Sequence, residues 1–414
     1  MAAPVESERR ISGSFVLGDR VVPGEIAISD GWITGLVVGD DSSRSTSTGA
    51  DSSRPGRRIE REQVDAPLVV APGFIDVHVH GSGGASAMDG PGQLDRLAGI
   101  LAARGVTAFL PTSVSAPLPE LARFVADVRA VRIEQDGPRD VTERPPARAR
   151  ILGASLEGPA IDPAHHGAHD PATIIDPAAL LAAWRATPAD WAEVRIVTLA
   201  PERRGGLELV RHLAHLGVIA SLGHTGATAD EARAAFGAGA RSTTHLLNAM
   251  TGIGARVPGV AGAALADPRA TVELIADGLH VDPVLWPILW RVLGRRLLLV
   301  SDAMPAAGLG DGTYRLGSLA VSVIDGRALT ADGSLAGSTI NLGDGVANLI
   351  GVGLALPRAV AAATMTPATL LGRRDLGRIS VGARADLVVL DPAGRVQRTM
   401  IDGEWLAQPP RFSE

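Results

Sequence analysis

Histidines and carboxylates in several separate segments of the chain could together bind a metal ion. The closest pair, His78 and His80, follows an apolar run and precedes the glycine-rich stretch Gly81-Ser82-Gly83-Gly84. Alternate side chains of a strand point to the same side, so we expect the two imidazoles to lie together, an arrangement that suits a divalent ion. An isolated pair is equally consistent with two strand histidines that meet solvent, so further ligands are needed to decide.

Further polar residues stand directly after other apolar runs of the chain. They are Glu157, His224, His245, the segment Asp277-Gly278-Leu279-His280, and Asp302. Five of the ten histidines, counting His78 and His80, occupy such positions. One of them alone would more often be an ordinary core or rim histidine, but the whole set favours a metal site.

The chemistry of zinc-like ions predicts roles for these residues. Such an ion binds imidazole nitrogens and a carboxylate oxygen and leaves one position for water. Glu157, His224 and His245 would supply three ligands from three strands, and His78 and His80 could hold a second ion. A metal ion lowers the pKa of bound water and polarises a carbonyl group.

Asp302 has two interpretations in this scheme. It could take the proton from the metal-bound water and pass it to the leaving group, or it could be one more metal ligand. Together with the metal ligands, the first role predicts metal-assisted hydrolysis of an amide or a related C–N bond.

The composition restricts the class of protein. The chain has 414 residues, of which 46% are hydrophobic and 20% charged, as in a soluble globular protein. Its net charge of −6 argues against nucleic acid or an anionic membrane as partner. No apolar run is long enough to span a membrane, and the N-terminus lacks a signal-peptide pattern, so we expect a cytoplasmic enzyme.

Two residue types are missing from the chain. Without cysteine there can be no disulfide and no thiolate metal site, and without lysine there can be no Schiff base and no carboxylated lysine between two metals. Any anionic metal ligand must therefore be Asp or Glu.

Alternating apolar runs and helical patterns predict the elements that position these residues. Between 67 and 302, eight runs read as strands: 73–80, 106–110, 150–157, 194–199, 217–222, 242–245, 271–276 and 297–302. Helical patterns separate many of them, which predicts an α/β fold, a (β/α)8 TIM-like barrel whose site lies at the carboxyl ends of the strands. A doubly wound sheet is the alternative, but no Gly-x-Gly-x-x-Gly turn opens a first helix.

Both termini read as short strands, which predicts one small β-sandwich domain formed by the two ends of the chain. We expect residues 1–66 to form its N-terminal part, with a flexible insertion at 39–64 that is rich in Ser, Asp and Arg. Residues 67–374 would form the metal-dependent barrel, and residues 375–414 the C-terminal part of the small domain.

Several motifs in these segments carry a family resemblance. They are Pro72 to Gly81, Leu156-Glu157-Gly158-Pro159, Gly223-His224-Thr225, Thr244 to Met250, Ala276 to His280 and Val300 to Ala303. From about residue 11 to 405 the chain resembles the amidohydrolase superfamily and, within it, the N-acetylglucosamine-6-phosphate deacetylase family. The resemblance implies hydrolysis of the acetamide of N-acetyl-D-glucosamine 6-phosphate to D-glucosamine 6-phosphate and acetate, in amino-sugar catabolism or cell-wall recycling.

The resemblance also implies roles for individual residues. Glu157, His224 and His245 would bind the main metal, Asp302 would act as general base and then acid, and His280 would contact the substrate carbonyl. The sugar-phosphate pocket would be formed by Ala168, His169, Asn248, Ala249, Leu335, Ala336 and Gly337. Arg256 would reach the substrate phosphate across the interface of a homodimer; considered alone, it reads as an exposed surface arginine.

Some properties of such an enzyme stay open at this point. The resemblance implies one or two ions, Zn²⁺ before Fe²⁺, Mn²⁺ or Co²⁺. Alternative substrates are N-acetylgalactosamine 6-phosphate and other N-acyl sugar phosphates, whereas cyclic amides are disfavoured by the missing lysine. An inactive sugar-phosphate-binding barrel is a further alternative, but it would be expected to have lost a ligand or Asp302.

Overall fold

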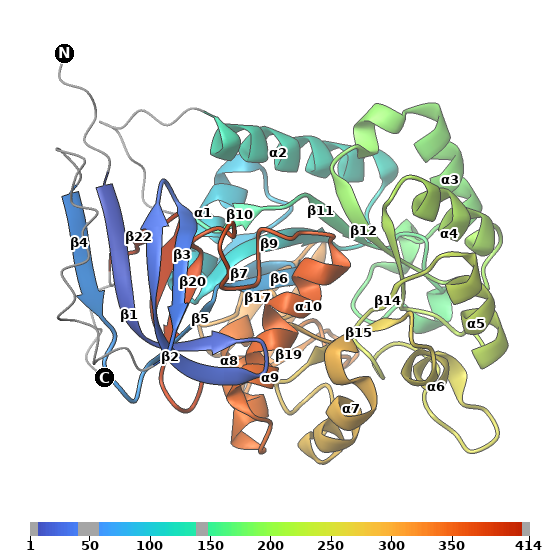
Figure 1. The fold of residues 1–414 in the computed structure, drawn as a ribbon. Helices are drawn as coiled ribbons and strands as arrows, with labels where there is room; N and C mark the ends of the chain where they lie inside the picture. Colours follow the sequence, from blue (N-terminus) through green and yellow to red (C-terminus); the bar gives the residue numbers. More distant parts are fainter. Residues whose placement is uncertain (1–6, 40–57, 138–147, 408–414) are drawn as a thin grey trace.

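Both ends of the chain form one sheet that stands beside a barrel of parallel strands (Figure 1). The structure is a computed structural model that describes residues 7–39, 58–137 and 148–407. None of the helices in these ranges has the length and apolar character needed to cross a membrane.

Eight parallel strands of the described residues form the barrel, in an order around it that follows the sequence. They are β6 (Phe74–Val79), β9 (Val106–Ser113), β11 (Ala154–Glu157), β12 (Val194–Leu199), β13 (Ile219–Leu222), β14 (Ser242–Thr243), β15 (Thr271–Ile275) and β16 (Leu297–Val300). The short β10 (Arg150–Ile151) precedes β11 and pairs with β9.

Backbone contacts just beyond β16 connect the last strand to the first. Val79 and Ala303 form a parallel bridge, and the Asp302 N–H donates to the His78 carbonyl at 2.9 Å. The barrel is therefore nearly closed, and the predicted (β/α)8 architecture is confirmed.

Apolar side chains fill the inside of the barrel. One buried cluster includes Ala108 of β9, Ile196 of β12, Ile275 of β15 and Leu298 of β16. Strands from different sides of the barrel share this cluster, so it fills the interior below the strand ends. This explains why the strands read as continuous apolar runs, since they are buried on both faces.

Helices cover the outside of the barrel (Figure 1). They are α1 (Pro91–Ala103), α2 (Leu118–Asp136), α3 (Pro177–Ala186), α4 (Gly206–His215), α5 (Ala229–Ala238), α6 (Gly259–Ala266), α7 (Trp286–Leu293), α8 (Leu342–Gly351), α9 (Leu356–Ala363) and α10 (Met365–Leu370). The buried faces of α1 to α9 pack on the outward side chains of the strands in a second, larger apolar cluster, whereas Ala368 and Leu370 of α10 belong to the cluster inside the barrel.

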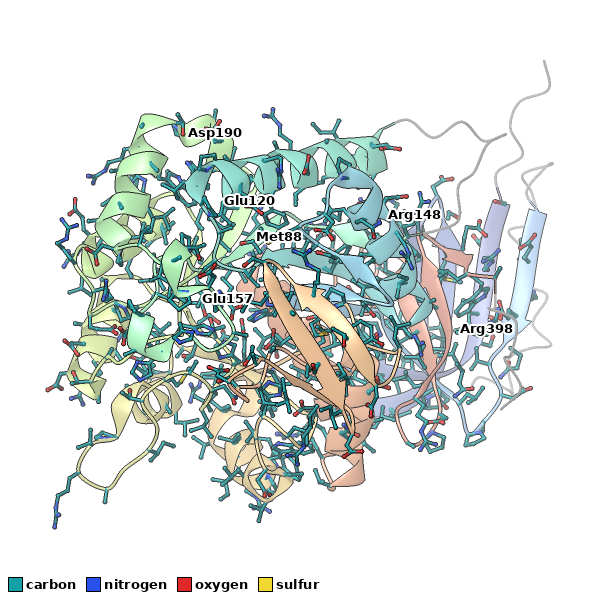
Figure 2. All side chains as sticks on the ribbon, turned by 180° about the vertical axis from the view of Figure 1, so that it is seen from behind. Met88, Glu120, Arg148, Glu157, Asp190 and Arg398 are labelled. Carbon is teal, nitrogen blue, oxygen red and sulfur yellow. The ribbon has the colours of Figure 1, made fainter. Side chains whose placement is uncertain are left out.

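A short meander follows the last barrel strand and covers the carboxyl ends of the strands. It consists of β17 (Gly312–Leu316), β18 (Leu319–Ile324) and β19 (Arg327–Leu329). Figure 2 shows these strands in front of the barrel, on the side of Glu157. A two-stranded hairpin, β7 (Gly81–Ser82) and β8 (Ala85–Ser86), follows the first barrel strand.

The small sheet combines strands from both ends of the chain, as predicted. Its order is β22 (Glu404–Trp405), β21 (Val396–Ile401), β20 (Leu387–Leu390), β5 (Val69–Pro72), β1 (Ser7–Leu17), β2 (Arg20–Ser29) and β3 (Trp32–Val38), with β4 (Arg58–Gln63) also paired to β1. The sheet branches at β1, which pairs with β4 in its first half and with β5 in its second. Ile11, Phe15, Ile26, Val389 and Met400 belong to its apolar core.

The strand β4 corrects one expectation. We predicted a loop over 39–64, but residues 58–63 pair with β1 along their length. Apart from Ile59, this edge strand consists of charged and polar residues. Glu60 forms an ion pair with Arg9 at 3.3 Å, and Glu62 accepts from the Trp405 indole at 2.6 Å. Residues 58–63 therefore form a strand because they pair with β1, which is distant in the sequence. Residues 40–57 of the predicted loop lie outside the described residues.

Candidate metal centre

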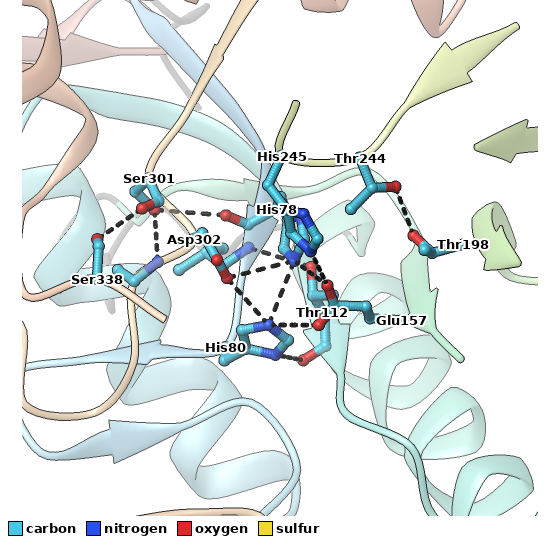
Figure 3. Close-up of polar contacts among 12 residues, drawn as sticks. His78, His80, Thr112, Glu157, Thr198, Thr244, His245, Ser301, Asp302 and Ser338 are labelled. Atoms are coloured by element: carbon cyan, nitrogen blue, oxygen red, sulfur yellow. Dashed lines mark hydrogen bonds and ion pairs between the residues drawn. The ribbon is translucent and has the colours of Figure 1, made fainter. Parts of the chain in front are cut away.

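The predicted ligands come together at the carboxyl ends of five barrel strands. His78 is the last residue but one of β6, His80 follows that strand, and Glu157 is the last residue of β11. The others stand two residues after a strand: His224 after β13, His245 after β14 and Asp302 after β16. All six are buried. Figure 3 shows His78, His80, Glu157, His245 and Asp302 pointing toward one another.

Glu157 lies between two groups of possible ligands. Its Oε1 is 3.1 Å from His224 Nε2 and 2.8 Å from His245 Nε2. Its Oε2 is 3.2 Å from His80 Nε2. His78, His80 and Asp302 form the other group, in which Asp302 Oδ1 is 3.4 Å and 3.2 Å from the two Nε2 atoms. One carboxylate thus contacts both groups, as a ligand shared by two metal ions would.

The outer nitrogen of three imidazoles is held by an acceptor. His78 Nδ1 lies 3.0 Å from a Glu273 oxygen, His80 Nδ1 lies 3.1 Å from the Thr112 carbonyl, and His224 Nδ1 lies 2.8 Å from the His165 carbonyl. A carbonyl or carboxylate oxygen only accepts, so each Nδ1 carries the proton. Each Nε2 is then free to bind a metal, which is the usual arrangement of metal-binding histidines.

The contacts between the imidazoles indicate that a cation belongs here. The Nε2 atoms of His78 and His80 are 3.3 Å apart, and those of His224 and His245 are 3.0 Å apart. Two lone pairs at this distance repel unless a proton or a metal ion lies between the nitrogens. The residues therefore fit one or two divalent ions, with nitrogen and oxygen donors typical of zinc sites.

Without such an ion, the carboxylates draw protons onto some of the imidazoles. Burial disfavours the charged form of His80, but hydrogen bonds with Asp302 and Glu157 outweigh this effect and raise its pKa to about 9. Burial and the neighbouring His169 lower the pKa of His224 to about 4. Burial also disfavours the charged form of Asp302, but His78 and His80 lower its pKa to about 2.

His169 lies within ligand distance but has the opposite tautomer. Its Nδ1 accepts the Ser115 N–H at 2.9 Å, so the proton is on Nε2, which is 3.2 Å from Glu157 Oε2. Nε2–H therefore donates to Glu157 and has no lone pair for a metal. This histidine orients the shared carboxylate in place of binding the ion.

Three of the predicted residues have an unusual backbone. His224, His245 and Asp302 adopt φ angles of 49°, 28° and 48°, in the left-handed region that non-glycine residues rarely occupy. Each is the second residue after its strand, so the same turn directs all three side chains across the barrel opening. Backbone strain of this kind is typical of functional sites.

A cavity of about 410 Å³ opens above these residues. Among the predicted substrate-binding residues, those that line it are Ala168, His169, Asn248, Ala249, His280, Leu335 and Gly337. Ala336 is fully buried in the apolar cluster of the β17–β19 meander and does not line it. Arg256 is exposed in the loop before α6, away from the cavity lining of its own chain.

His280 is oriented for a role at this cavity. Its Nδ1 lies 2.6 Å from Asp277 Oδ2, so Nδ1 carries the proton and Nε2 is left for a ligand in the cavity. The structure thus places this pair where the strand β15 ends.

Comparison with known proteins agrees with this geometry. The chain matches the amidohydrolase family over residues 69–406. The chain belongs to the amidohydrolase family. A divalent metal is therefore implied for this amidohydrolase by its family as well as by its ligand groups.

Several relatives of this amidohydrolase have curated names. The N-acetylgalactosamine-6-phosphate deacetylase of Escherichia coli O157:H7 is 40% identical over 348 residues, which cover 82% of this chain and 88% of that protein. The N-acetylglucosamine-6-phosphate deacetylase of Vibrio furnissii is 37% identical, with 81% and 82% covered. Among solved structures, a mutant N-acetyl-D-glucosamine-6-phosphate deacetylase from Mycobacterium smegmatis in complex with N-acetyl-D-glucosamine-6-phosphate has a TM-score of 0.83 and 35% identity, with 96% and 99% covered.

Two buried carboxylates of this amidohydrolase were not among the predicted site residues. Glu273 in β15 contacts His78, and Asp76 in β6 accepts from the Ser301 hydroxyl at 2.5 Å and from the His78 N–H at 3.3 Å. The available signal was a charged residue within an apolar strand, which is costly unless it has a partner.

Proposed function

We propose that this amidohydrolase removes the acetyl group of N-acetyl-D-glucosamine 6-phosphate by metal-dependent hydrolysis and releases D-glucosamine 6-phosphate and acetate. The observation that carries the proposal is the pair of ligand groups that share Glu157 below a cavity, with the carboxylate of Asp302 beside them. The names of the relatives and the sugar phosphate bound to the mycobacterial enzyme support the substrate.

The proposed cofactor is Zn²⁺, at one or two positions. Glu157, His224 and His245 would hold one ion, and His78 and His80 would hold a second together with Glu157 and Asp302. A bound ion supplies an acidified water and polarises the acetyl carbonyl.

Asp302 and His280 would then handle the proton and the carbonyl. The pKa of Asp302 is lowered to about 2, so its carboxylate is ionised at neutral pH and can accept a proton from the attacking water. The same carboxyl group can return that proton to the leaving amine. His280 would position the acetyl group through Nε2, with Asp277 holding its ring.

Arg256 would supply the charge that recognises the phosphate. None of the described residues that line the cavity is an arginine, although a guanidinium suits a phosphate well. In the loop of Arg256, Ile253 and Val257 are 56% and 66% exposed, which favours contact of this loop with a second subunit. We therefore propose a homodimer in which Arg256 reaches the site of the other subunit. A cytoplasmic location would suit a phosphorylated substrate, which does not cross membranes unaided.

N-Acetylgalactosamine 6-phosphate is the second candidate substrate. The relative from Escherichia coli O157:H7, at 40% identity, is named for this epimer. The two sugars differ in the orientation of one hydroxyl group, and a site built to hydrogen-bond that hydroxyl can discriminate strongly.

The test is acetate release from both phosphorylated epimers, beside unphosphorylated N-acetylglucosamine, with metal analysis and a chelator control. We expect chelator-sensitive turnover of the phosphorylated sugars only, with a higher kcat/KM for the glucosamine epimer. A higher value for the galactosamine epimer would establish the second candidate. No turnover of either, in protein that contains metal, would reject both substrates.

A further inference from the structure

Glu273 is a charged residue in the middle of a buried strand. It lies in β15 between Val272 and Leu274, and only 2% of its surface is exposed. A buried carboxylate is costly unless hydrogen-bond donors compensate its charge. In the described part of the chain, its side chain has one ion-pair partner, His78, and no arginine.

One oxygen of Glu273 contacts both ligand groups. Oε2 is 3.0 Å from His78 Nδ1 and accepts the backbone N–H of His245 at 3.1 Å. His78 belongs to the group with His80 and Asp302, whereas His245 contacts Glu157 and His224 in the other group. Like Glu157, Glu273 is thus a carboxylate that connects the two groups.

The two contacts have different effects on the ligands. The contact with His78 keeps the proton on Nδ1 and leaves Nε2 free for a metal. The contact with His245 acts on the backbone of a residue whose φ is 28°, so it favours the strained turn that directs this imidazole to Glu157.

We propose that Glu273 is a positioning residue that prepares both halves of the metal centre at once, through the tautomer of His78 and the backbone of His245. The proposal rests on the proposed metal centre but not on the identity of the substrate. It predicts that metal affinity, and not only turnover, depends on a carboxylate that contacts two metal ligands but does not itself bind the ion.

Two substitutions separate the charge of Glu273 from its hydrogen bonds. Glu273→Gln keeps an oxygen for the two N–H donors but removes the charge, and Glu273→Leu removes both. Loss of such an outer partner typically weakens metal binding about 10–100-fold. We expect a loss in this range for Glu273→Gln and a larger one for Glu273→Leu. Glu193→Gln is the matched control, since Glu193 is also buried but pairs with Arg132, away from the metal ligands.

The measurement is Zn²⁺ stoichiometry by elemental mass spectrometry after dialysis, and the Zn²⁺ dissociation constant by competition with a chromophoric chelator. Circular dichroism of each metal-free variant checks that it is folded. Equal stoichiometry and affinity in wild type, Glu273→Gln and Glu193→Gln would overturn the proposal. Absence of Zn²⁺ from the wild type would instead reject the metal centre itself.

A double-mutant cycle with His78→Gln tests whether Glu273 acts through His78. If it does, Glu273→Gln weakens Zn²⁺ binding much less in the His78→Gln background than in the wild type. If the losses of Zn²⁺ affinity in the two single variants simply add in the double variant, Glu273 does not act through His78. Should the Glu273 variants fail to fold, the tautomer of His78 in ¹⁵N-histidine-labelled, zinc-loaded wild type decides: Nδ1–H supports the proposal, and Nε2–H overturns it.

Discussion

The backbone of Asp302 fixes the side chain that we propose to transfer the proton. Its N–H donates to the His78 carbonyl at 2.9 Å, and its own carbonyl accepts from the Ser338 N–H at 2.7 Å. These bonds hold the residue at a φ of 48°, with its carboxylate toward His78 and His80. An ionised carboxylate held beside the metal ligands is in position to take a proton from the attacking water.

Asp302→Asn should separate proton transfer from metal binding. An amide has nearly the same shape but cannot accept the proton, so we expect kcat to fall about 10²–10⁴-fold. The ion held by Glu157, His224 and His245 should remain. Steady-state kinetics and elemental analysis of the purified variant check both statements. A kcat within about tenfold of the wild type would remove Asp302 from proton transfer.

At the scale of the elements, buried charges join the small sheet to the barrel. Arg150 of β10 contacts Asp402 in the turn between β21 and β22 at 2.7 Å, and Arg384 contacts the same oxygen at 2.9 Å. Next to them, Asp386 accepts the Asp402 N–H at 2.8 Å, but its buried Oδ2 has no hydrogen-bond partner among the described residues. Burial raises the pKa of Asp386 from 3.8 to about 6.

Asp386→Asn should therefore change how stability depends on pH. Between about pH 4 and 6, Asp386 is ionised in the unfolded wild type but still protonated in the folded wild type. The free energy of unfolding of the wild type therefore falls as pH rises. Asparagine has no carboxyl proton, so the free energy of unfolding of the variant does not fall for this reason. Relative to the wild type, we expect it to gain ~1–3 kcal/mol between about pH 4 and pH 7. Urea unfolding of both proteins at the two pH values measures the gain, and an equal difference at both would contradict the prediction.

At the scale of the whole molecule, the proposed metal centre connects strands from all around the barrel. Its proposed ligands come from β6 and β11, from the residue after β6, and from the turns after β13, β14 and β16. A metal ion that binds the folded state stabilises it, by about 4 kcal/mol at a thousandfold excess over its dissociation constant. The centre should therefore stabilise the fold as well as support catalysis.

Removing the metal should lower the thermal stability of the protein. For a chain of this size, the loss of about 4 kcal/mol should lower the Tm by about 5 °C. Differential scanning fluorimetry before and after chelation, and after Zn²⁺ is added back, measures the change. An unchanged Tm, in protein shown to lose its metal, would mean that the ligand residues are held by the protein alone.

The proposed dimer makes a prediction for Arg256. Arg256→Ala should raise KM for the phosphorylated sugar about 10–100-fold, with kcat little changed, because a bidentate phosphate contact is lost. Mixing Arg256→Ala with Asp302→Asn subunits tests whether the arginine crosses between subunits. Random exchange would restore about a quarter of the wild-type sites if it does, and none if it does not.

The barrel, and the gathering of the candidate ligands at one end of it, could be predicted from local patterns. Each strand is an apolar run, and each predicted ligand stands directly at its end, so the eight-strand topology alone brings His78, Glu157, His224, His245 and Asp302 to one face. This prediction did not require knowing which side chains contact one another.

Other features depended on contacts between distant segments. β4 has one apolar residue, Ile59, and forms a strand because its backbone pairs with that of β1, 51 residues away at the pair Arg9 and Glu60. His169 was predicted only to line the sugar-phosphate pocket; in the fold it lies within ligand distance of Glu157, but the Ser115 N–H occupies its Nδ1 and leaves the proton on Nε2. Glu273 reads as an odd charge in a strand until His78 and His245 face it. The sequence determines which side chain stands at each position and which segments favour strands. The protonation state of a side chain and the pairing of a strand depend on the partner that the fold places beside it.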